Sequence, residues 1–138
     1  MRFAQDTKAE ALKRSPLFEG LSRKQLARIA RVSDDLEVPA GTVLCEEGSR
    51  GREFFVIISG EATVARGGKL LATVGPGDFF GEIALLKQVR RTATIRTRTP
   101  CLLLVLSRAQ FVELVLETPA LRAQVERVAA SRLAQFQT

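Results

Sequence analysis

The sequence predicts a mainly β domain with flanking helices. Nine of its ten glycines fall between Gly41 and Gly81, and only Gly20 lies outside that stretch. Because glycine permits tight turns, this distribution indicates many short strands in the middle of the chain. Both ends instead show helix-capping motifs followed by apolar residues at helical spacing. Many short strands at close spacing favour a sandwich or a barrel with a rolled topology.

The amino-terminal region, residues 1–34, predicts two helices. The first spans about Gln5 to Arg14 and stops ahead of Pro16, because proline disfavours helical backbone in the residue before it. The second begins after Ser22, which forms a Ser-x-x-Gln capping box with Gln25. Two helices are therefore expected before the first strand.

Seven short apolar runs in the middle of the chain are predicted as strands. The Gly67-Gly68 pair between two of them is typical of a two-residue hairpin. Glycine and proline clusters separate other runs and are expected to form turns. The predicted strands are Leu36–Val38, Thr42–Glu46, Phe54–Ser59, Ala62–Arg66, Lys69–Val74, Ala93–Thr97 and Cys101–Leu106.

The carboxyl-terminal region, residues 108–138, predicts two more helices. A Ser-x-x-Gln capping box at Ser107 opens the first helix. Thr118 is the predicted N-cap of the second, with Pro119 at its first helical position. Apolar residues keep helical spacing in this last helix up to about Phe136.

Composition argues against an enzyme or a metal protein. The chain has no histidine, which removes the commonest general base and the commonest metal ligand. Cys45 and Cys101 lie far apart in apolar runs, so we expect two buried free thiols rather than a metal site or a disulfide. The longest apolar run, Cys101 to Leu106, is too short to cross a membrane. Residues 1–138 therefore predict a single cytoplasmic domain without a membrane segment, a catalytic residue, a metal or a cofactor.

The charge balance indicates an anionic partner. Lys and Arg number 21 against 15 Asp and Glu, which leaves a net charge of +6. We interpret the basic cluster on the second predicted helix as a solvated face, with a nucleic-acid surface as the alternative, and expect no nucleic acid as a partner of this chain alone. The cluster consists of Arg23, Lys24, Arg28 and Arg31.

The most informative stretch reads GDFFGEIALLKQVRRTAT and spans Gly77 to Thr94. Glu82 lies just inside a glycine-bounded turn, an apolar helical run follows it, and Arg91 comes nine positions later. A turn that leads into a helix offers free backbone N–H groups to an anion, and an arginine adds a planar fork for phosphate oxygens. A carboxylate beside such a site makes sense if the ligand also carries a hydroxyl donor. A phosphate and a hydroxyl close together indicate a sugar phosphate or a nucleotide.

The position of Arg91 relative to the next strand predicts that its side chain is buried. Counting by twos from Ile95, which we take as inward, Ala93 and Arg91 share the inward side. Arg96 and Arg98 share the opposite side and are expected to face water. Because an unpaired guanidinium is costly to bury, we expect Arg91 to hold an anion.

This stretch resembles the phosphate-binding cassette of cyclic nucleotide-binding domains, and the similarity extends over roughly residues 15–135. The resemblance implies an eight-stranded jelly roll, a double-stranded β-helix barrel, over residues 35–107, with the cassette at 77–94 and residues 108–138 as a helical lid. It also implies that Glu82 accepts from the ribose 2′-hydroxyl and that Arg91 binds the cyclic phosphate. The ligand-binding residues that it implies are Gly81, Glu82, Ile83, Ala84, Arg91, Thr92 and Ala93.

The base site is less defined by the resemblance. The candidates for base contacts are Val64, Leu71 and Ala72 in the strands and Val128, Leu133 and Phe136 in the last helix, each with a plain core role as the alternative. Phe79 and Phe80 are interpreted as core residues. The ligand favoured is cAMP, and the hydroxyl of Thr92 leaves cGMP open.

We therefore predict a non-catalytic cyclic nucleotide sensor that couples ligand binding to movement of its helices from Arg108 onward. Its expected partners are the nucleotide and either a protein effector or a second copy of the chain. One alternative is an interaction scaffold of the same fold that binds no nucleotide, although a scaffold needs neither Glu82 nor Arg91. Another is a fragment of a DNA-binding transcription regulator, which would need a helix-turn-helix domain after the last helix.

Overall fold

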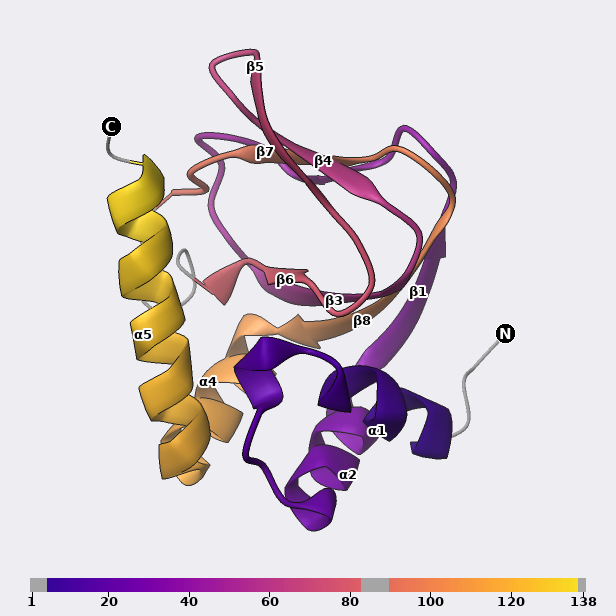
Figure 1. Cartoon of the computed structure of the whole chain (residues 1–138), viewed down its shortest axis with the longest axis vertical. Coiled ribbons are helices and arrows are strands. Elements are labelled where there is room, and N and C mark those ends of the chain that lie inside the picture. Colours follow the sequence, from indigo (N-terminus) through magenta and orange to yellow (C-terminus); the bar gives the residue numbers. More distant parts are fainter. Residues whose placement is uncertain (1–4, 83–89, 137–138) are drawn as a thin grey trace.

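The computed structural model describes the backbone of residues 5–82 and 90–136 and the side chains of residues 8–82 and 90–132. Strands form the middle of the described chain and helices flank them (Figure 1), which confirms the predicted fold class. The helical elements are α1 (Gln5–Lys13), the 3-10 helix η1 (Pro16–Phe18), α2 (Arg23–Val32), α4 (Arg108–Glu117) and α5 (Pro119–Phe136). The strands are β1 (Asp34–Val38), β2 (Val43–Cys45), β3 (Glu53–Ser59), β4 (Ala62–Arg66), β5 (Lys69–Val74), β6 (Phe79–Phe80), β7 (Thr94–Thr97) and β8 (Cys101–Ser107).

The strands form two antiparallel sheets of four, in the orders β1-β8-β3-β6 and β2-β7-β4-β5. The two sheets face each other as a roll (Figure 1). Among the described strands no ladder joins the sheets, so the eight strands form two facing sheets rather than a closed barrel. Between β5 and β6 the chain makes a turn that bonds both to β3 and within itself. Ile57 N donates to Asp78 O at 2.8 Å, and Gly77 N donates to Ile57 O at 2.9 Å. Asp78 N donates to Gly75 O at 3.0 Å, and Gly75 N donates to Asp78 Oδ2 at 2.8 Å.

The helices and strands begin and end within two residues of the predicted bounds, and both capping boxes form. The strand predicted to start at Thr42 starts one residue later, because the Thr42 N–H donates to the hydroxyl of Thr97 at 2.8 Å instead of to a ladder. Strand β6 was not predicted, since two residues are too few to show a period.

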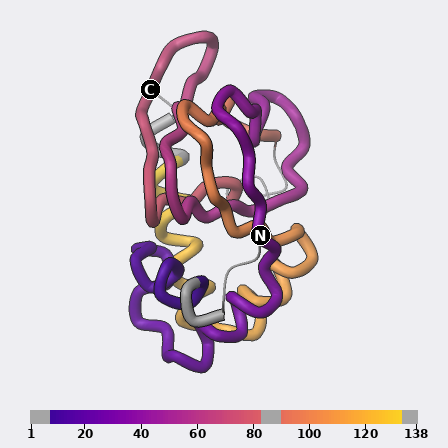
Figure 2. The backbone as a smooth tube through the Cα atoms, turned by 90° about the vertical axis from the view of Figure 1, so that its right-hand side faces the viewer, coloured from indigo at the N-terminus to yellow at the C-terminus, as the bar shows by residue number. Residues whose placement is uncertain are grey.

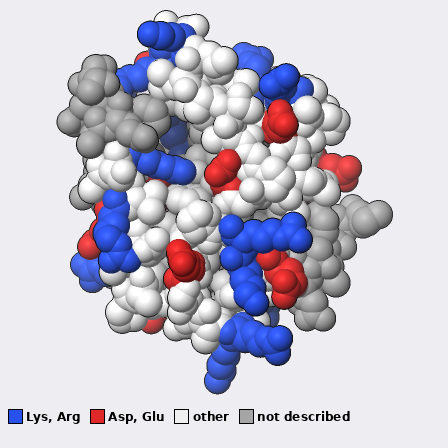
Figure 3. Space-filling model, in the orientation of Figure 1, with Lys and Arg blue, Asp and Glu red and all other residues white. Residues whose placement is uncertain are grey.

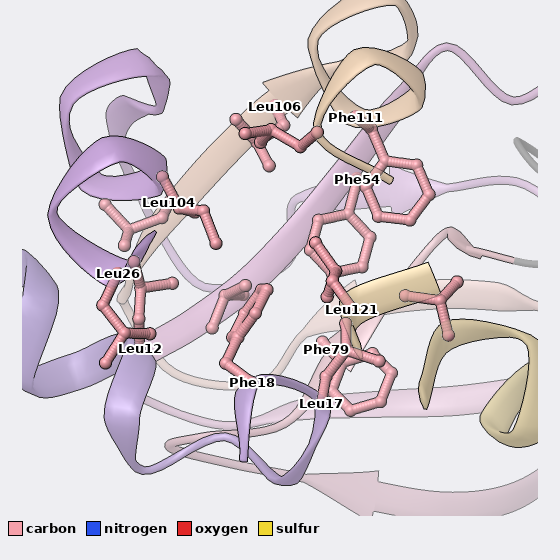
Figure 4. Packing of buried hydrophobic residues seen from close by; sticks show 14 of the residues in the cluster. Leu12, Leu17, Phe18, Leu26, Phe54, Phe79, Leu104, Leu106, Phe111 and Leu121 are labelled. Atoms are coloured by element: carbon pink, nitrogen blue, oxygen red, sulfur yellow. The ribbon is translucent and has the colours of Figure 1, made fainter. Parts of the chain in front are cut away.

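The larger hydrophobic core lies between the β1-β8-β3-β6 sheet and the helices (Figure 4). Phe54 of β3 is fully buried there, and its ring stacks on Phe111 of α4 with 4.6 Å between centroids. Phe18 meets the same ring edge-on at 6.4 Å. Phe55, which follows Phe54 in β3, faces the inside of the roll, and its ring stacks on Phe80 with 5.0 Å between centroids. Because successive strand residues face opposite sides, β3 supports the helical layer with one face and the inside of the roll with the other.

A buried ion pair joins α1 to the start of the sheet, at the end of the molecule where Figures 1 and 2 both place α1, α2 and α4. Lys8 Nζ lies 2.7 Å from Asp35 Oδ1, and each side chain is 6% exposed. The same nitrogen donates to the carbonyl oxygens of Ala30 at 3.1 Å and Ser33 at 2.9 Å, at the end of α2. A cation is favourable where a helix leaves its last carbonyls unpaired. One ammonium group therefore connects α1, the end of α2 and β1.

Lys8→Met is expected to lower the free energy of unfolding by about 3–5 kcal/mol, because it removes the ammonium group from a buried carboxylate. Urea unfolding followed by circular dichroism measures the change. The matched control is Lys13→Met at the exposed end of the same helix, expected within about 0.5 kcal/mol of the parent. If Lys8→Met unfolds at the same urea concentration as the parent, this ammonium group does not hold the three elements together.

Candidate functional site

A cavity of about 200 Å³ is lined by residues of the strands and by Arg132 of α5, the helix that runs beside the roll in Figure 1. Both sheets contribute to its walls, which combine apolar strand residues with the charged side chains of Glu82, Arg91 and Arg132. The described lining residues are Cys45, Val64, Ala72, Val74, Phe79, Phe80, Gly81, Glu82, Arg91, Thr92, Ala93, Ile95 and Arg132.

Arg91 is buried, with 8% of its surface exposed, whereas Arg98 faces water, as the parity of the strand predicted. The backbone around it is fixed, because Arg91 N donates to Ser49 O at 2.7 Å and Gly48 N donates to Arg91 O at 2.9 Å. In the side chain, Nη2 donates to the carbonyl oxygen of Glu53 at 2.8 Å. The other terminal nitrogen, Nη1, is buried and has no hydrogen-bond partner among the described residues. Arg91 therefore brings an unsatisfied N–H donor to the cavity.

Gly81 leaves room for this guanidinium. Its φ is +106°, in the region that favours glycine. A Cβ at this position would lie 2.6 Å from Glu53 O and 2.8 Å from Arg91 Nη1. Because one of these atoms is backbone, a side chain at position 81 would displace either β3 or the guanidinium. The glycine before Glu82 is thus required by the arginine that follows it in the sequence.

Glu82 is almost fully buried, with 1% of its surface exposed. One carboxylate oxygen, Oε1, accepts a hydrogen bond from Arg132 Nη1 within an ion pair. The other, Oε2, is buried and has no partner among the described residues. Burial raises the pKa of this carboxyl above its ordinary value, while Arg132 and, more weakly, Arg91 act to lower it. Glu82 therefore offers one oriented acceptor oxygen to a hydroxyl donor.

Arg132 of α5 is a site residue that the sequence reasoning missed. Its guanidinium carbon lies 4.2 Å from the centroid of the Phe79 ring, in addition to the ion pair with Glu82. A signal was available in the helical spacing. Arg132 follows Val125 by seven positions and Ala129 by three, and both of these are fully buried. A charge on the buried side of a helix needs a partner or a ligand.

The charges of the described cavity do not balance. The guanidinium groups of Arg91 and Arg132 face the single carboxylate of Glu82, which leaves one positive charge in excess. In a site partly removed from water, this excess favours a ligand with one negative charge. The apolar remainder of the lining suits an apolar or aromatic group. The arrangement therefore fits a singly charged anion that has a hydroxyl donor and an apolar part.

Several of the other predicted residues also line the cavity. Thr92 is half-buried and Ala93 is buried on the chain segment that carries Arg91. Val64 and Ala72, which were proposed as base contacts, lie opposite each other in the β4–β5 ladder and both border the cavity. The structure thus brings the cassette residues together with an apolar wall from the hairpin.

Other predicted base contacts are not brought to the cavity. Leu71 is 41% exposed and is absent from the described lining, because neighbouring strand residues face opposite sides and Ala72 takes the cavity side. Val128 packs against the helical core instead. The side chains of four predicted residues lie outside the described residues: Ile83, Ala84, Leu133 and Phe136.

The sequence reasoning did not place Cys45, Val74 or Ile95 at the site, although all three line it. Phe79 and Phe80 are buried in the core, as predicted, and also border the cavity. A residue that serves both the core and a site has an ordinary apolar pattern, so periodicity alone does not separate the two roles.

Both cysteines are free and buried, as the composition predicted. In the part of the chain that the structure describes, no group of cysteine and acidic side chains has the arrangement of a metal site. No described helix has both the length and the apolar character needed to cross a membrane.

Residues 35–118 match the family model of the cyclic nucleotide-binding domain, so the chain belongs to this family and the resemblance is confirmed. A cyclic nucleotide-gated potassium channel of Rhizobium etli is 35% identical over 117 residues, which cover 85% of this chain and 33% of the channel. The cAMP-dependent protein kinase regulatory subunit of Schizosaccharomyces pombe is 34% identical over 89 residues, which cover 64% of this chain and 22% of that protein. The similarity therefore concerns one part of each relative.

Solved structures show the same fold. Cyclic AMP-bound PfPKA-R aligns with a TM-score of 0.84 and 25% identity, over 96% of this chain and 45% of that chain. The chain is thus a domain of the kind found in cyclic nucleotide-dependent kinase subunits and channels, with two facing sheets and flanking helices.

Because the pKa of Glu82 is raised, the free energy of unfolding is expected to depend on pH. A carboxyl whose pKa is higher in the folded protein contributes most stability below its unfolded pKa and loses it as the pH rises through the folded value. Glu82→Gln copies the protonated form, so without ligand it is expected to be more stable than the parent at pH 7. The difference should shrink toward a pH of about 4. Urea unfolding of both proteins at the two pH values measures this, and a less stable variant at pH 7 would show that Arg132 more than offsets the burial.

Proposed function

We propose that this chain binds a cyclic nucleotide, cAMP rather than cGMP, and acts as a non-catalytic cytoplasmic sensor. The observation that carries the proposal is that two buried atoms, Glu82 Oε2 and Arg91 Nη1, have no hydrogen-bond partner among the described residues and belong to residues that line one cavity. A buried polar atom without a partner is costly, so a site that keeps both a donor and an acceptor unsatisfied is suited to a ligand that completes both. A nucleotide with a ribose hydroxyl and a cyclic phosphate supplies the two matching groups.

Glu82 is the proposed acceptor for the ribose 2′-hydroxyl. An ionised carboxylate only accepts hydrogen bonds, so its free oxygen requires a donor from the ligand. The ion pair with Arg132 holds the carboxylate in one orientation and counteracts the effect of burial on its pKa. In a scaffold that binds no nucleotide, this buried oxygen would lack a ligand donor and would only destabilise the fold.

Arg91 is the proposed partner of the phosphate. A cyclic phosphate diester carries one negative charge, which matches the single excess positive charge of the described lining. A 5′-monophosphate carries a second charge and lacks the ring that places the phosphate beside the ribose. Hydrogen bonds to charged groups contribute roughly 1.5–3 kcal/mol each, so the loss of this partner should be easy to measure.

The base is proposed to lie against the apolar wall that includes Val64 and Ala72. Guanine has more hydrogen-bonding groups on its edge than adenine, and few polar groups in the described lining could bond them, which favours adenine. The hydroxyl of Thr92 is the exception, because this residue lines the cavity and is half-buried. For this reason cGMP stays the second candidate ligand.

The proposed signal is a change in the position or mobility of α5. Arg132 connects this helix to Glu82, so a ligand hydroxyl that bonds Glu82 acts on a group that α5 also holds. A ligand that binds one arrangement of the helix better shifts the population toward that arrangement. A protein effector or a second copy of the chain would respond to this shift.

Arg91→Leu is expected to weaken cAMP binding by about 2–5 kcal/mol, because it leaves the phosphate desolvated without its cation. Isothermal titration calorimetry with cAMP, cGMP and 5′-AMP measures the affinities, and the method suits a chain that has no Trp or Tyr. The parent is expected to bind the cyclic nucleotides better than 5′-AMP.

The matched control is Arg98→Leu, which removes a surface arginine whose ion pair with Glu61 spans 3.7 Å. Its cAMP affinity should equal that of the parent. Equal binding by Arg91→Leu would refute the site assignment. No heat with either cyclic nucleotide, together with an unchanged melting temperature, would favour the scaffold.

Hydrogen exchange measured by mass spectrometry should report the movement of the helices. We expect cAMP to change amide protection between Arg108 and Phe136, where α4 and α5 lie, in addition to the residues around the cavity. Strand β1, at the edge of the β1-β8-β3-β6 sheet and with no residue in the described lining, serves as an internal reference. Identical protection of α4 and α5 with and without ligand would argue against coupling through these helices.

A further inference from the structure

Cys45 is the one thiol that lines the cavity among the described residues. It ends β2, next to a register shift in the β2–β7 ladder, and 5% of its surface is exposed. The neighbouring cavity residues include Arg91 and Glu82, whose charges both act on the thiol. Cys45 therefore faces a polar ligand site as well as the apolar core.

Two independent observations indicate that this thiol borders a site for a ligand. Within the part of the chain that the structure describes, Glu82 Oε2 and Arg91 Nη1 have no hydrogen-bond partner, and both residues are more than nine-tenths buried. They line the same cavity of about 200 Å³ as Cys45. A group attached to the sulfur would extend into the space that these two atoms border.

We propose that Cys45 is a covalent regulatory site of this cavity, an inference that rests on the proposed function. A small disulfide or thiosulfonate that attaches a group to Cys45 excludes the cyclic nucleotide, and bound nucleotide shields Cys45 from such reagents. The two events are mutually exclusive because they compete for the same space between Cys45, Arg91 and Glu82.

The chemical step is thiol–disulfide exchange. The thiolate of Cys45 attacks one sulfur of a small disulfide RSSR, a Cys45–S–S–R bond forms, and RS⁻ leaves. The proton of the thiol passes to solvent when the thiolate forms. The incoming disulfide is reduced to one thiolate while Cys45 is oxidised, and a reducing thiol reverses the modification.

Electrostatics makes this reaction slow at neutral pH. Burial raises the pKa of the Cys45 thiol to about 11, Arg91 acts to lower it, and Glu82 and Glu53 act to raise it. Because the thiolate is the nucleophile, the modification rate should rise about tenfold per pH unit between pH 7 and 9. An ordinary thiol with a pKa of about 8.5 would begin to level off in this range.

Cys101 provides the internal control. It is 1% exposed and is absent from the described cavity lining. Its sulfur lies within hydrogen-bond distance of the carbonyl oxygens of Glu61, at 3.4 Å, and Thr99, at 3.3 Å. Modification of Cys101 should therefore be independent of a ligand in the cavity.

The test uses methyl methanethiosulfonate, which transfers a CH₃S group to a thiolate and releases methanesulfinate. Peptide mass spectrometry follows both cysteines in the full chain, with and without cAMP. At a cAMP concentration of 100 times Kd, only about one hundredth of the protein is free, so modification of Cys45 should slow about 100-fold. Calorimetry of the modified protein should show at least a tenfold loss of cAMP affinity, and reduction with dithiothreitol should restore it.

Two variants assign the effect to one sulfur. Cys101→Ser should lose cAMP affinity on treatment as the parent does. Cys45→Ala, whatever its own affinity, should bind cAMP equally well before and after treatment. If Cys101→Ser does not fold, peptide mapping of the parent still distinguishes the two thiols.

The outcomes separate this inference from the proposed function. If the untreated parent shows no binding of cAMP or cGMP, the proposed function fails and the inference fails with it. If the parent binds cAMP but the ligand does not protect Cys45, or the modified protein keeps its affinity, only the covalent site is overturned. A Cys45 that stays unmodified at pH 9, while the same chain reacts fully in guanidinium chloride, also overturns it.

Discussion

The guanidinium of Arg91, buried inside the roll, is the constraint on which the rest of the site depends. Its burial is compatible with folding because one edge bonds the Glu53 carbonyl of β3 and because Gly81 lacks the side chain that would displace it. Hydrogen bonds between the backbone of Arg91 and the backbone of Gly48 and Ser49 fix the position from which this side chain extends. A buried cation of this kind adds little net stability by itself. Its Nη1 donor, which has no hydrogen-bond partner among the described residues, is instead positioned to bind an anion.

The second constraint is the contact of a distant helix with the same cavity. Arg132 lies 50 positions after Glu82 in the sequence, yet its guanidinium pairs with that carboxylate and stacks on Phe79. The contact makes α5 part of the site rather than a cover placed over it. The Arg132 side chain is 25% exposed, whereas Val125 and Ala129 earlier in the same helix are fully buried, so the core holds the Arg132 end of α5 less tightly. This property is what a coupling element between a ligand site and a partner needs.

Much of the fold was predictable because its signals are local, and so was the placement of the two charged residues, Glu82 and Arg91, at the candidate site. Capping boxes, glycine turns and strand parity each depend on a few neighbouring residues, and so does the spacing of Glu82 and Arg91. The residues that were missed depend on contacts across the chain. Arg132 can be assigned to the site only when the packing of α5 beside the cavity is known. Cys45 is indistinguishable from an ordinary core residue until its neighbours in the cavity are known. The division of the eight strands into two sheets was not predictable for the same reason, since it depends on pairing between edges that no single strand reveals.

A single carboxylate in a poorly solvated cavity also explains why a nucleotide should be preferred to free phosphate. Burial already disfavours the ionised form of Glu82, and the charge of Arg91 partly counteracts this. An anion bound to Arg91 would cancel that help and raise the pKa of Glu82 further. A ribose hydroxyl that donates to Oε2 restores the balance, because it favours the ionised form. An anion without a neighbouring hydroxyl lacks this compensation, so we expect Glu82 to disfavour phosphate alone and to favour phosphate joined to ribose.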